Sequence, residues 1–473
     1  MFKKEDTILH FVGIGGIGMS GIAEVFLNQG YKVVGSDLVE SESTRRLAEL
    51  GAKIFIGHRS ENVQGAHVVV VSSAVKATNP EVLAAKSALI PVIPRAEMLA
   101  ELMRGRVGIA VAGTHGKTTT TSMLATILTH AGLDPTLVIG GKVDSLGGNA
   151  KLGSGNYLVA EADESDGSFL QLPATFGIIT NIDNDHLDHY GSLSAIEEAF
   201  VKFVGKLPFY GVAVICGEDA GVKRCMDRWT KPFLTYGFSA DWDIYATDVS
   251  CGGFGSKFQV FHRVAAQKGL KKSEHELLGE VLLSVPGKHN VLNALACIAI
   301  ALQLEIPFSS IVLGLKQFRG VKRRFDLRWK DSKNSRAIVD DYGHHPVEIT
   351  ATLEAARSYW PGRIITVFQP HRYSRTLHCK DGFLTAFLLS DVVLVTDIYG
   401  AGEDPIPGVD SSSLVGEMKK TARPGQEIFY VGDLSGAKSH VAGIFKENDL
   451  VLCLGAGSIT RLPDQLIPHE IEK

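Results

Sequence analysis

Short apolar runs alternate with mixed stretches up to about residue 105 of the chain, and each run predicts a buried strand followed by a helix. The predicted strands cover residues 7–12, 32–35 and 67–72, and the predicted helices cover residues 19–29, 43–50 and 80–88. Alternation of this kind is typical of a parallel sheet covered by helices.

The alternation continues beyond residue 105. A strand at 107–112 precedes a helix at 118–130. A longer helix at 291–304 carries apolar residues at helical spacing, namely Val291, Leu295, Ile298, Ala299 and Leu302. Four further strands are predicted at 337–339, 364–368, 392–396 and 450–454. The pattern breaks at 260–280, a polar stretch without a clear period, where we expect an exposed hairpin or loop.

The length of the chain indicates that this α/β pattern forms several domains. A chain of 473 residues and 50.9 kDa is too long for one ordinary hydrophobic core. We therefore expect three α/β domains with mostly parallel sheets, and we place them at residues 1–105, 106–319 and 320–473.

Composition narrows the partners and the compartment. The net charge of −4 and the pI near 6.5 give no reason to expect nucleic acid or a membrane surface as a partner. Six scattered cysteines without a CxxC pair suggest free, buried thiols in a reducing compartment. Glu5 and Asp6 precede a short apolar run, so the start is no signal peptide, and the helix at 291–304 is too short to span a bilayer. We expect a cytoplasmic protein.

The segment GTHGKTTT, residues 113–120, lies between a predicted strand and a predicted helix. A glycine-rich turn in that position directs backbone N–H groups and a helix N-terminus at one point, which favours a polyphosphate. Lys117 would reach the outer phosphates and the Thr118 hydroxyl would bind Mg²⁺. The spacing GxxGKT is two residues tighter than GxxxxGK[ST], and the alternative is a turn that matches by chance.

A second glycine-rich turn, GIGGIG at residues 13–18, also follows a strand and precedes a helix, with Asp37 nineteen residues beyond its last glycine. By itself this pattern predicts dinucleotide binding, with Asp37 on a ribose hydroxyl. Other nucleotides with a pyrophosphate satisfy the same geometry. A tight turn without a ligand is the alternative.

Two acidic segments follow predicted strands. The first contains four carboxylates, Glu161, Asp163, Glu164 and Asp166, and an acid at the end of a strand beside a phosphate loop can hold Mg²⁺. A solvated acidic turn is the alternative. The second, NIDNDHLDHY at 181–190, contains His186 and His189. Two histidines without a cysteine argue against zinc, so we expect His186 near the metal and phosphate and His189 on the surface.

Three polar segments in the second half of the chain each allow two interpretations. In GKHNVLNA, residues 287–294, Asn290 either reads an adenine edge or caps the helix. The basic run 321–326 is either solvated surface or a source of charge near a triphosphate. Arg372 and Arg375 lie three apart after a strand and either clamp a carboxylate or form structural ion pairs.

Taken together and in order, GIGGIGMSG, GTHGKTTT, EADESD, NIDNDHLDHY, GKHNVLNA, RRFD, DDYGHHP and PHRYSRT resemble the Mur ligase family over nearly the whole chain. The resemblance is strongest to the family member that adds L-alanine to UDP-N-acetylmuramate. It implies an N-terminal Rossmann-like domain that binds the UDP-sugar, a central phosphate-loop ATPase domain and a C-terminal Rossmann-like domain.

The resemblance also implies the site residues. It assigns catalysis to Lys117, His186, Arg324 and His344, and metal binding to Thr118, Glu161 and His186. It assigns ATP to Gly113, Thr114, His115, Gly116, Lys117, Thr118, Thr119, Asn290, Asn293, Arg324 and Asp341. It assigns the UDP-sugar to Gly15, Gly16, Ile17, Gly18, Met19, Ser20, Asp37, His58, Ser72 and Ser73, and the amino acid to Tyr342, His344, His371, Arg372 and Arg375.

The activity implied by this resemblance is ATP-dependent amide formation in peptidoglycan precursor synthesis, with ATP and Mg²⁺ or Mn²⁺ as cofactors. UDP-N-acetylmuramate and L-alanine are the implied partners, and the protein is expected to be a monomer or a weak homodimer. The alternatives are a sister ligase that adds a tripeptide, or glutamate to a folate, an NAD-dependent dehydrogenase, and a non-catalytic nucleotide sensor. The dehydrogenase leaves the phosphate loop and the acidic segment without a role, and the sensor does not explain Lys117, Thr118, Glu161 and His186.

Overall fold

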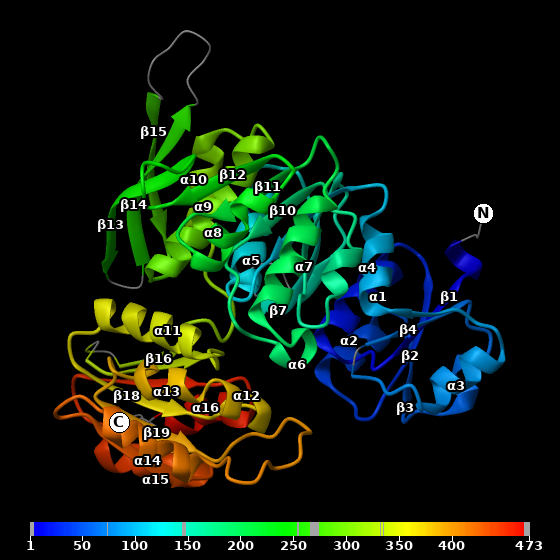
Figure 1. Ribbon diagram of the computed structural model, residues 1–473. Coiled ribbons are helices and arrows are strands. Elements are labelled where there is room, and N and C mark those ends of the chain that lie inside the picture. The colour runs from blue at the N-terminus through cyan, green and yellow to red at the C-terminus, as the bar shows by residue number, and fades with distance from the viewer. Residues whose placement is uncertain are drawn as a thin grey trace. The chain divides into compact units, whose positions relative to one another are not determined.

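Three β-sheets form the framework of the chain in the computed structural model, which describes residues 4–72, 74–143, 148–252, 255–264, 274–331, 333 and 335–467 (Figure 1). The sheets contain five, ten and six strands. The chain is therefore a three-domain α/β protein with mostly parallel sheets, as the sequence pattern predicts.

The first sheet has the strand order β3-β2-β1-β4-β5, and all of its pairs are parallel. Its strands are β1 (Ile8–Val12), β2 (Lys32–Asp37), β3 (Lys53–Ile56), β4 (Val68–Val71) and β5 (Val92–Pro94). Its helices are α1 (Ile17–Asn28), α2 (Glu42–Glu49), α3 (Pro80–Ser87) and α4 (Arg95–Met103). The strand order reverses between β1 and β4, and such a reversal is where open α/β sheets bind ligands, outside the carboxyl ends of the strands.

The second sheet has the order β15-β14-β13-β12-β11-β10-β6-β9-β7-β8. Its central strands β6 (Val107–Ala112), β9 (Tyr157–Glu161), β10 (Phe176–Ile179) and β11 (Val212–Cys216) are parallel. Around them lie β7 (Thr136–Val143), β8 (Gly148–Lys151), β12 (Phe233–Gly237), β13 (Ile244–Gly252), β14 (Gly255–Val264) and β15 (Glu274–Leu283). Its helices are α5 (Lys117–His130), α6 (Leu187–Tyr190), α7 (Leu193–Gly205), α8 (Ala220–Cys225), α9 (Lys288–Gln303) and α10 (Phe308–Gln317).

The third sheet has the order β16-β17-β21-β18-β19-β20, and only the β16–β17 pair is antiparallel. Its strands are β16 (Asp326–Lys330), β17 (Ala337–Asp341), β18 (Arg363–Phe368), β19 (Val392–Thr396), β20 (Glu427–Gly432) and β21 (Asp449–Leu454). Its helices are α11 (Pro346–Tyr359), α12 (Tyr373–His378), α13 (Lys380–Ala386), α14 (Ser411–Thr421), α15 (Leu434–Ile444) and α16 (Leu462–Leu466).

Both faces of the third sheet are buried under helices. One apolar cluster joins alternate strand residues to α11, α13 and α14, and a second joins the other strand residues to α15 and α16. Alternate residues of a strand point to opposite faces, so the near-continuous apolar strands of this domain follow from burial on both sides.

The chain forms two compact units. The first unit comprises Met1–Asp248, Phe258–Leu282 and Leu292–Arg319, and the second comprises Val249–Lys257, Leu283–Val291 and Gly320–Lys473. Within the first unit one apolar cluster runs from the first sheet into the second, because residues such as Phe11 and Ile22 belong to the same cluster as Ala110 and Ile179. The boundary at residue 105 lies inside this unit and stays a prediction.

The polar stretch 260–280, which has no clear period in the sequence, forms strands in the structure. Two long strands, β14 and β15, lie next to each other in the second sheet and cover most of it, while 265–273 lies outside the described residues. Of the two predicted alternatives, a hairpin or a loop, the neighbouring strands agree with the hairpin. Polar and apolar residues mix in both strands, and much of β15, which lies at the edge of the sheet, is exposed.

None of the six cysteines forms a disulfide, as predicted, but two of the six are not buried. Cys216, Cys225, Cys297 and Cys453 are buried as predicted, whereas Cys251 and Cys379 are partly exposed. In the part of the chain that the structure describes, no helix is both long and apolar enough to cross a membrane.

Candidate active site

The turn 113–116 connects β6 to α5, and its glycines are required by its geometry. Gly113 has a φ of 130° and Gly116 a φ of 84°, both in a region that side chains disfavour. A Cβ atom on Gly113 would lie 2.0 Å from the Thr180 hydroxyl oxygen. A Cβ atom on Gly116 would lie 2.9 Å from Asn293 Oδ1, so this predicted adenine contact lies against the turn.

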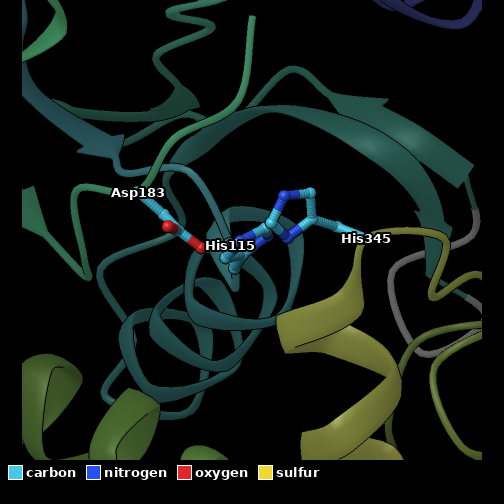
Figure 2. Close-up of side chains that lie close together, drawn as sticks. All are labelled: His115, Asp183 and His345. Carbon is cyan, nitrogen blue, oxygen red and sulfur yellow. Dashed lines mark hydrogen bonds and ion pairs between the residues drawn. The ribbon is translucent and has the colours of Figure 1, made fainter. Parts of the chain in front are cut away.

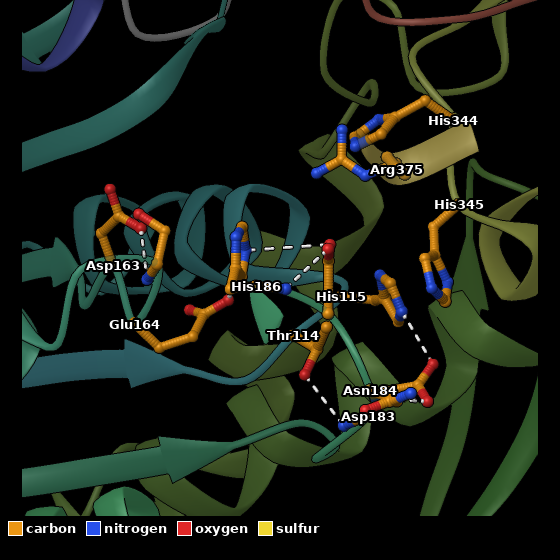
Figure 3. A network of polar contacts seen from close by, with 12 residues as sticks. Thr114, His115, Asp163, Glu164, Asp183, Asn184, His186, His344, His345 and Arg375 are labelled. Carbon is orange, nitrogen blue, oxygen red and sulfur yellow. Dashed lines mark hydrogen bonds and ion pairs between the residues drawn. The ribbon is translucent and has the colours of Figure 1, made fainter. Parts of the chain in front are cut away.

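The segment that follows β10 fixes the conformation of this turn. The His115 N–H donates to Asn181 Oδ1 at 2.8 Å, and the Asn181 amide donates back to the His115 carbonyl at 3.0 Å. The Asp183 N–H donates to the Thr114 hydroxyl at 2.9 Å (Figure 3). His115 and Asp183 point toward one another, with 3.1 Å between Nε2 and the carboxylate (Figure 2). The turn is thus held from one side by four polar contacts, which come from Asn181 and Asp183.

Lys117, the first residue of α5, bends back over the turn. Its ammonium donates to the carbonyls of Gly113 and Thr114 and to Glu164 Oε1, at 2.7, 3.1 and 2.9 Å. Burial alone would lower the Lys117 pKa, but attraction to Glu164, Asp163 and Glu161 outweighs it and raises that pKa. Lys117 therefore stays charged beside the turn.

Glu164 is the acidic residue that the structure places beside both Lys117 and His186. Its side chain is 2% exposed, and His186 Nε2 lies 3.6 Å from Oε1 (Figure 3). Burial raises the Glu164 pKa and the Lys117 charge opposes that rise. The second oxygen, Oε2, is buried and has no hydrogen-bond partner among the described residues.

Glu161 ends β9 and contacts a different segment. Its carboxylate accepts from the Gly140 N–H at 2.7 Å, and a Cβ atom on Gly140 would meet it at 2.5 Å. Thr118 lies partly exposed in the first turn of α5, and Thr119 next to it is buried. The structure therefore joins Lys117, Glu164 and His186 directly, and Glu161 also attracts the Lys117 charge.

A cavity of about 340 Å³ in the first unit is lined by the turn 13–18 and by Lys117, the residue that follows the turn 113–116. Gly13, Gly16, Gly18 and Met19 line it together with Lys117 and Glu161. Arg95 reaches into the same cavity from the start of α4 and donates to Asp163 Oδ2 at 2.9 Å. One cavity therefore connects the turn of the first sheet to the phosphate loop of the second.

The turn 13–18 hydrogen-bonds to the end of β2. The Gly13 and Ile14 N–H groups donate to the Ser36 carbonyl, and the Gly15 N–H donates to Asp37 Oδ2 at 2.8 Å. The other Asp37 oxygen accepts from the Leu38 N–H. The carboxylate predicted to hold a ribose thus also supports the turn.

The other residues predicted for the UDP-sugar lie around the same turn. Gly16 precedes α1, Ile17 is exposed, and a Cβ atom on Gly18 would lie 2.7 Å from the Arg95 guanidinium. Met19 is buried and Ser20 donates its hydroxyl to the Ile17 carbonyl. The remaining positions are Ser72, which lines the cavity, His58, which follows β3, and Ser73, which lies outside the described residues.

Asn290 lies in α9 and does not cap it. The helix begins at Lys288, and the Asn290 amide donates to the Pro286 carbonyl at 2.7 Å. Asn290 and Asn293 are both largely buried. The alternative of an N-cap is therefore wrong, because two helical residues precede Asn290.

In the second unit, Asp341 organises the segment around the basic run. Its carboxylate accepts from the N–H groups of Phe325 and Gly343, each at 2.7 Å. Burial raises the Asp341 pKa, and the Arg324 charge opposes the rise. The Arg324 guanidinium lies 5.1 Å from the Tyr342 ring centre and 3.3 Å from Glu348 Oε1. The polar groups of DDYGHHP and RRFD therefore pack against each other.

The residues predicted for the amino acid form a second group in this unit. His344 and His371 have ring centres 5.8 Å apart, and Arg375 Nη1 lies 3.3 Å from His371 Nδ1. Burial, followed by the charges of Arg375 and Arg372, lowers the His371 pKa to about 4. Arg372 has a φ of 69° and lies 3.7 Å from Glu403. His371 is therefore neutral near pH 7 and does not repel the arginines.

Some of these contacts were missed by the sequence analysis. Glu164, Asn181 and Asp183 lie inside two of the motifs given above. The sequence marked these motifs as polar, but it could not show which of their polar residues contact the turn. Arg95 and Glu403 lie outside every motif. They reach the site through tertiary packing, for which the sequence carried no local signal.

A parallel-sheet fold with a phosphate loop, a buried Lys117–Glu164 pair and a glycine-rich turn at one cavity defines a nucleotide-dependent enzyme. Models of the Mur ligase family match residues 8–107 (catalytic domain), 111–301 (middle domain) and 323–457 (glutamate ligase domain). The chain belongs to the Mur ligase family.

Two relatives share 55% identity with the chain, and both are called UDP-N-acetylmuramate–L-alanine ligase. The protein of Trichlorobacter lovleyi matches over 97% of this chain and 98% of its own length, and that of Geobacter sulfurreducens over 97% and 96%. A solved UDP-N-acetylmuramate–alanine ligase of Thermotoga maritima has a TM-score of 0.78, 32% identity and coverage of 97% and 98%. A murein peptide ligase of Psychrobacter arcticus has a TM-score of 0.68, 25% identity and coverage of 97% and 98%.

The geometry of the turn predicts that Gly116→Ala abolishes most nucleotide binding. The substitution adds left-handed strain of about 1–2 kcal/mol, and it also forces a Cβ atom against Asn293. The matched control is Gly132→Ala, just beyond the same helix, where φ is 77° and no atom lies within 4 Å of the added carbon. Calorimetry with ATP should show weakened binding for Gly116→Ala alone, and thermal unfolding should show a larger loss of stability for Gly116→Ala than for Gly132→Ala because of the contact with Asn293. Equal affinities in the two variants would contradict the steric argument.

Proposed function

We propose that this chain forms an amide bond between L-alanine and the lactyl carboxylate of UDP-N-acetylmuramate at the expense of ATP. The products are UDP-N-acetylmuramoyl-L-alanine, ADP and phosphate. The observation that carries the proposal is the shared cavity, since Gly16 and Gly18 of one turn and Lys117 of the other line it together. The names of the 55% identical relatives support the choice of both substrates.

The reaction has two steps. First, a lactyl carboxylate oxygen attacks the γ-phosphorus of ATP, and the bond to ADP breaks, which gives an acyl phosphate. Second, the neutral amine of L-alanine attacks the acyl carbon, and phosphate leaves as the nitrogen loses its proton. In the first step an anion approaches an anion, so the site must supply positive charge.

Lys117 is the charged group best placed for that purpose. It lies at the N-terminus of α5, and it already binds the carbonyls of the turn. The backbone N–H groups of the turn and the helix terminus add positive potential. We propose that Lys117 turns its ammonium from Glu164 toward the transferred phosphoryl group when nucleotide binds.

A divalent cation fits the same place. The Thr118 hydroxyl, Glu161 and His186 are the proposed ligands, and the lone Oε2 of Glu164 adds a carboxylate oxygen of the kind that Mg²⁺ prefers. When bound, the cation would neutralise phosphate charge. Before nucleotide binds, Glu164 holds Lys117 and His186 close together, since its Oε1 lies 2.9 Å from Lys117 Nζ and 3.6 Å from His186 Nε2.

The amino acid is the proposed ligand of the second unit. Arg372 and Arg375 carry the charges for its carboxylate, and Tyr342, His344 and His371 shape the surroundings. The neutral state of His371 leaves the arginine charges available. Arg324 and Asp341 are the proposed nucleotide contacts of this unit. We place the enzyme in the cytoplasm, since six free thiols suit a reducing compartment and its nucleotide substrates are intracellular.

The test of this function is phosphate release from ATP in the presence of UDP-N-acetylmuramate and one amino acid at a time. L-Alanine should support turnover, and a preformed tripeptide should not. Calorimetry should show binding of UDP-N-acetylmuramate and no useful affinity for NAD. Release that depends on the tripeptide would identify the sister ligase, and tight NAD binding without UDP-sugar binding would overturn the proposal.

Lys117→Ala should lower turnover by about a hundredfold or more, the low end for one lost electrostatic contact in the transition state. Removal of the lysine also leaves the Glu164 charge buried, so Lys117→Arg is made in parallel to keep that ion pair, and thermal unfolding is measured for both. Lys151→Ala, which removes an exposed partner of Asp134, is the control and should keep normal turnover. Near-normal rates in both Lys117 variants would remove the phosphate loop from the mechanism.

Arg375→Ala or Arg372→Ala should raise the KM for L-alanine about ten- to a hundredfold, since a hydrogen bond to a charged group contributes about 1.5–3 kcal/mol. The KM for ATP should move far less. Lysine at either position should restore little, because an ammonium cannot match the planar fork of a guanidinium. Lys380→Ala, which removes the partner of Glu417 in a half-exposed ion pair, controls for loss of charge in the same unit. A rise in the ATP KM alone would assign the two arginines to the nucleotide.

A further inference from the structure

A carboxylate in the first turn of α11 lies between the basic run and the histidine segment of the second unit. Glu348 Oε1 accepts from Arg324 Nη1 at 3.3 Å, and Oε2 accepts from the His344 N–H at 3.1 Å. The Glu348 side chain is 11% exposed. One carboxylate therefore connects the Arg324 guanidinium with the backbone at His344.

Part of this arrangement is a helix cap. Glu348 is the third residue of α11, and Oε2 also accepts from the N–H of His345, the N-cap residue, at 3.4 Å. This contact is the acidic half of a capping box, a position in which glutamine occurs as well as glutamate. The cap accounts for Oε2. It does not account for Oε1, because a capping acceptor needs no cation beside it.

The Arg324 guanidinium lies among groups that keep it charged. Burial alone would lower the Arg324 pKa, but the charges of Glu348 and then of Asp341 outweigh burial and raise that pKa. The guanidinium also lies close enough to the Tyr342 ring for a cation–π contact. Asp341 accepts from two backbone N–H groups, whereas Glu348 accepts from the guanidinium itself. Glu348 is therefore the carboxylate that directs this side chain.

Arg324 needs such a partner because its own backbone does not belong to a regular element. It lies between α10 and β16, and its neighbours Arg323 and Phe325 have φ values of 60° and 51°. A long side chain in a turn loses rotamer freedom when it binds a ligand. A planar guanidinium that is anchored beforehand loses less of that freedom when it meets a phosphate group.

We propose that Glu348 is the positioning residue for Arg324, and that it holds the guanidinium in the direction in which it meets the phosphate oxygens of the nucleotide. The proposal rests on the proposed function, because it takes Arg324 as a nucleotide contact. Glu348 acts through Arg324 and contacts no reacting atom. Its charge near Oε1 therefore has a role that the capping box does not require.

The orientation of Arg324 is tested in the ligand-free protein. With ¹³C,¹⁵N-labelled arginine, NMR of the guanidinium carbon should show slow rotation about the Nε–Cζ bond of Arg324, whose signal is identified by its loss in Arg324→Lys. Glu348→Gln should make that rotation about fivefold faster, because a neutral hydrogen bond replaces a charged one. Arg363, bonded to Asp449 at 2.9 and 2.7 Å, is the reference for a held guanidinium, and Arg104, 70% exposed, is the reference for a mobile one. Wild-type rotation as fast as that of Arg104 would overturn the proposal, whether or not the enzyme ligates alanine.

The effect on catalysis is tested by alanine-dependent phosphate release. Glu348→Gln keeps the capping acceptor, so its midpoint of thermal unfolding should stay close to that of the wild type. Its kcat should fall about three- to tenfold, as expected for residues that act as neighbours. Arg324→Ala should lower kcat further, and the addition of Glu348→Gln to that variant should cause no further loss. Glu417→Gln, which removes the partner of Lys380 in a half-exposed ion pair, controls for the loss of a carboxylate in the same unit.

The two measurements separate this proposal from the proposed function. An unchanged kcat in Glu348→Gln, or an equal loss of kcat in the Arg324→Ala background, would show that Glu348 does not act through Arg324 and would overturn the proposal. If the wild type releases no phosphate in response to L-alanine, the proposed function fails. The rotation of the Arg324 guanidinium then decides by itself whether Glu348 holds that side chain.

Discussion

The close approach of the phosphate loop to the neighbouring strand is the constraint on which the active site depends. At Gly113 there is no room for a side chain, since an added Cβ atom would meet the Thr180 oxygen at 2.0 Å. The two backbones can therefore exchange hydrogen bonds through Asn181, Thr180 and His115. Because β6 and β10 are adjacent parallel strands, one register fixes the turn and the acidic segment together. The order of the strands thus places Asp183 beside the loop before any ligand binds.

Carboxylates at strand ends serve as scaffold in each of the three sheets. Asp37 ends β2 and accepts from Gly15, and Asp341 ends β17 and accepts from Phe325 and Gly343. Glu164 follows β9 and binds Lys117. In each case the carboxylate is stabilised by N–H or ammonium donors, and these donors would otherwise lack partners. Residues predicted for ligand contact therefore also set the shape of the turns that would receive the ligand.

The sequence predicted the fold class because its signals were local. Apolar runs marked β6 and the strands of the C-terminal sheet, and glycine spacing marked both turns. At 260–280 it left a hairpin and a loop as alternatives, because that stretch has no clear period, and the structure contains the neighbouring strands β14 and β15 there. It also could not choose among the four acids of EADESD, because only the packing of β9 beside β6 brings the Glu164 carboxylate within 2.9 Å of the Lys117 ammonium. Arg95 and Glu403 come from other elements and leave no local pattern.

Several strained backbone conformations are also held by tertiary contacts, which the local sequence does not reveal. His186, Arg323, Phe325 and Arg372 all have φ between 51° and 69°, although none is glycine. Such conformations persist only when the surroundings hold them, and they gather at functional sites. Asp185 receives the His186 N–H, Asp341 receives the Phe325 N–H, and Glu403 lies beside Arg372. A carboxylate thus neighbours each of these three strained residues. Charged hydrogen bonds and ion pairs offset the energy of the strained backbone. The positive φ also gives these side chains directions that a regular helix or strand would not allow.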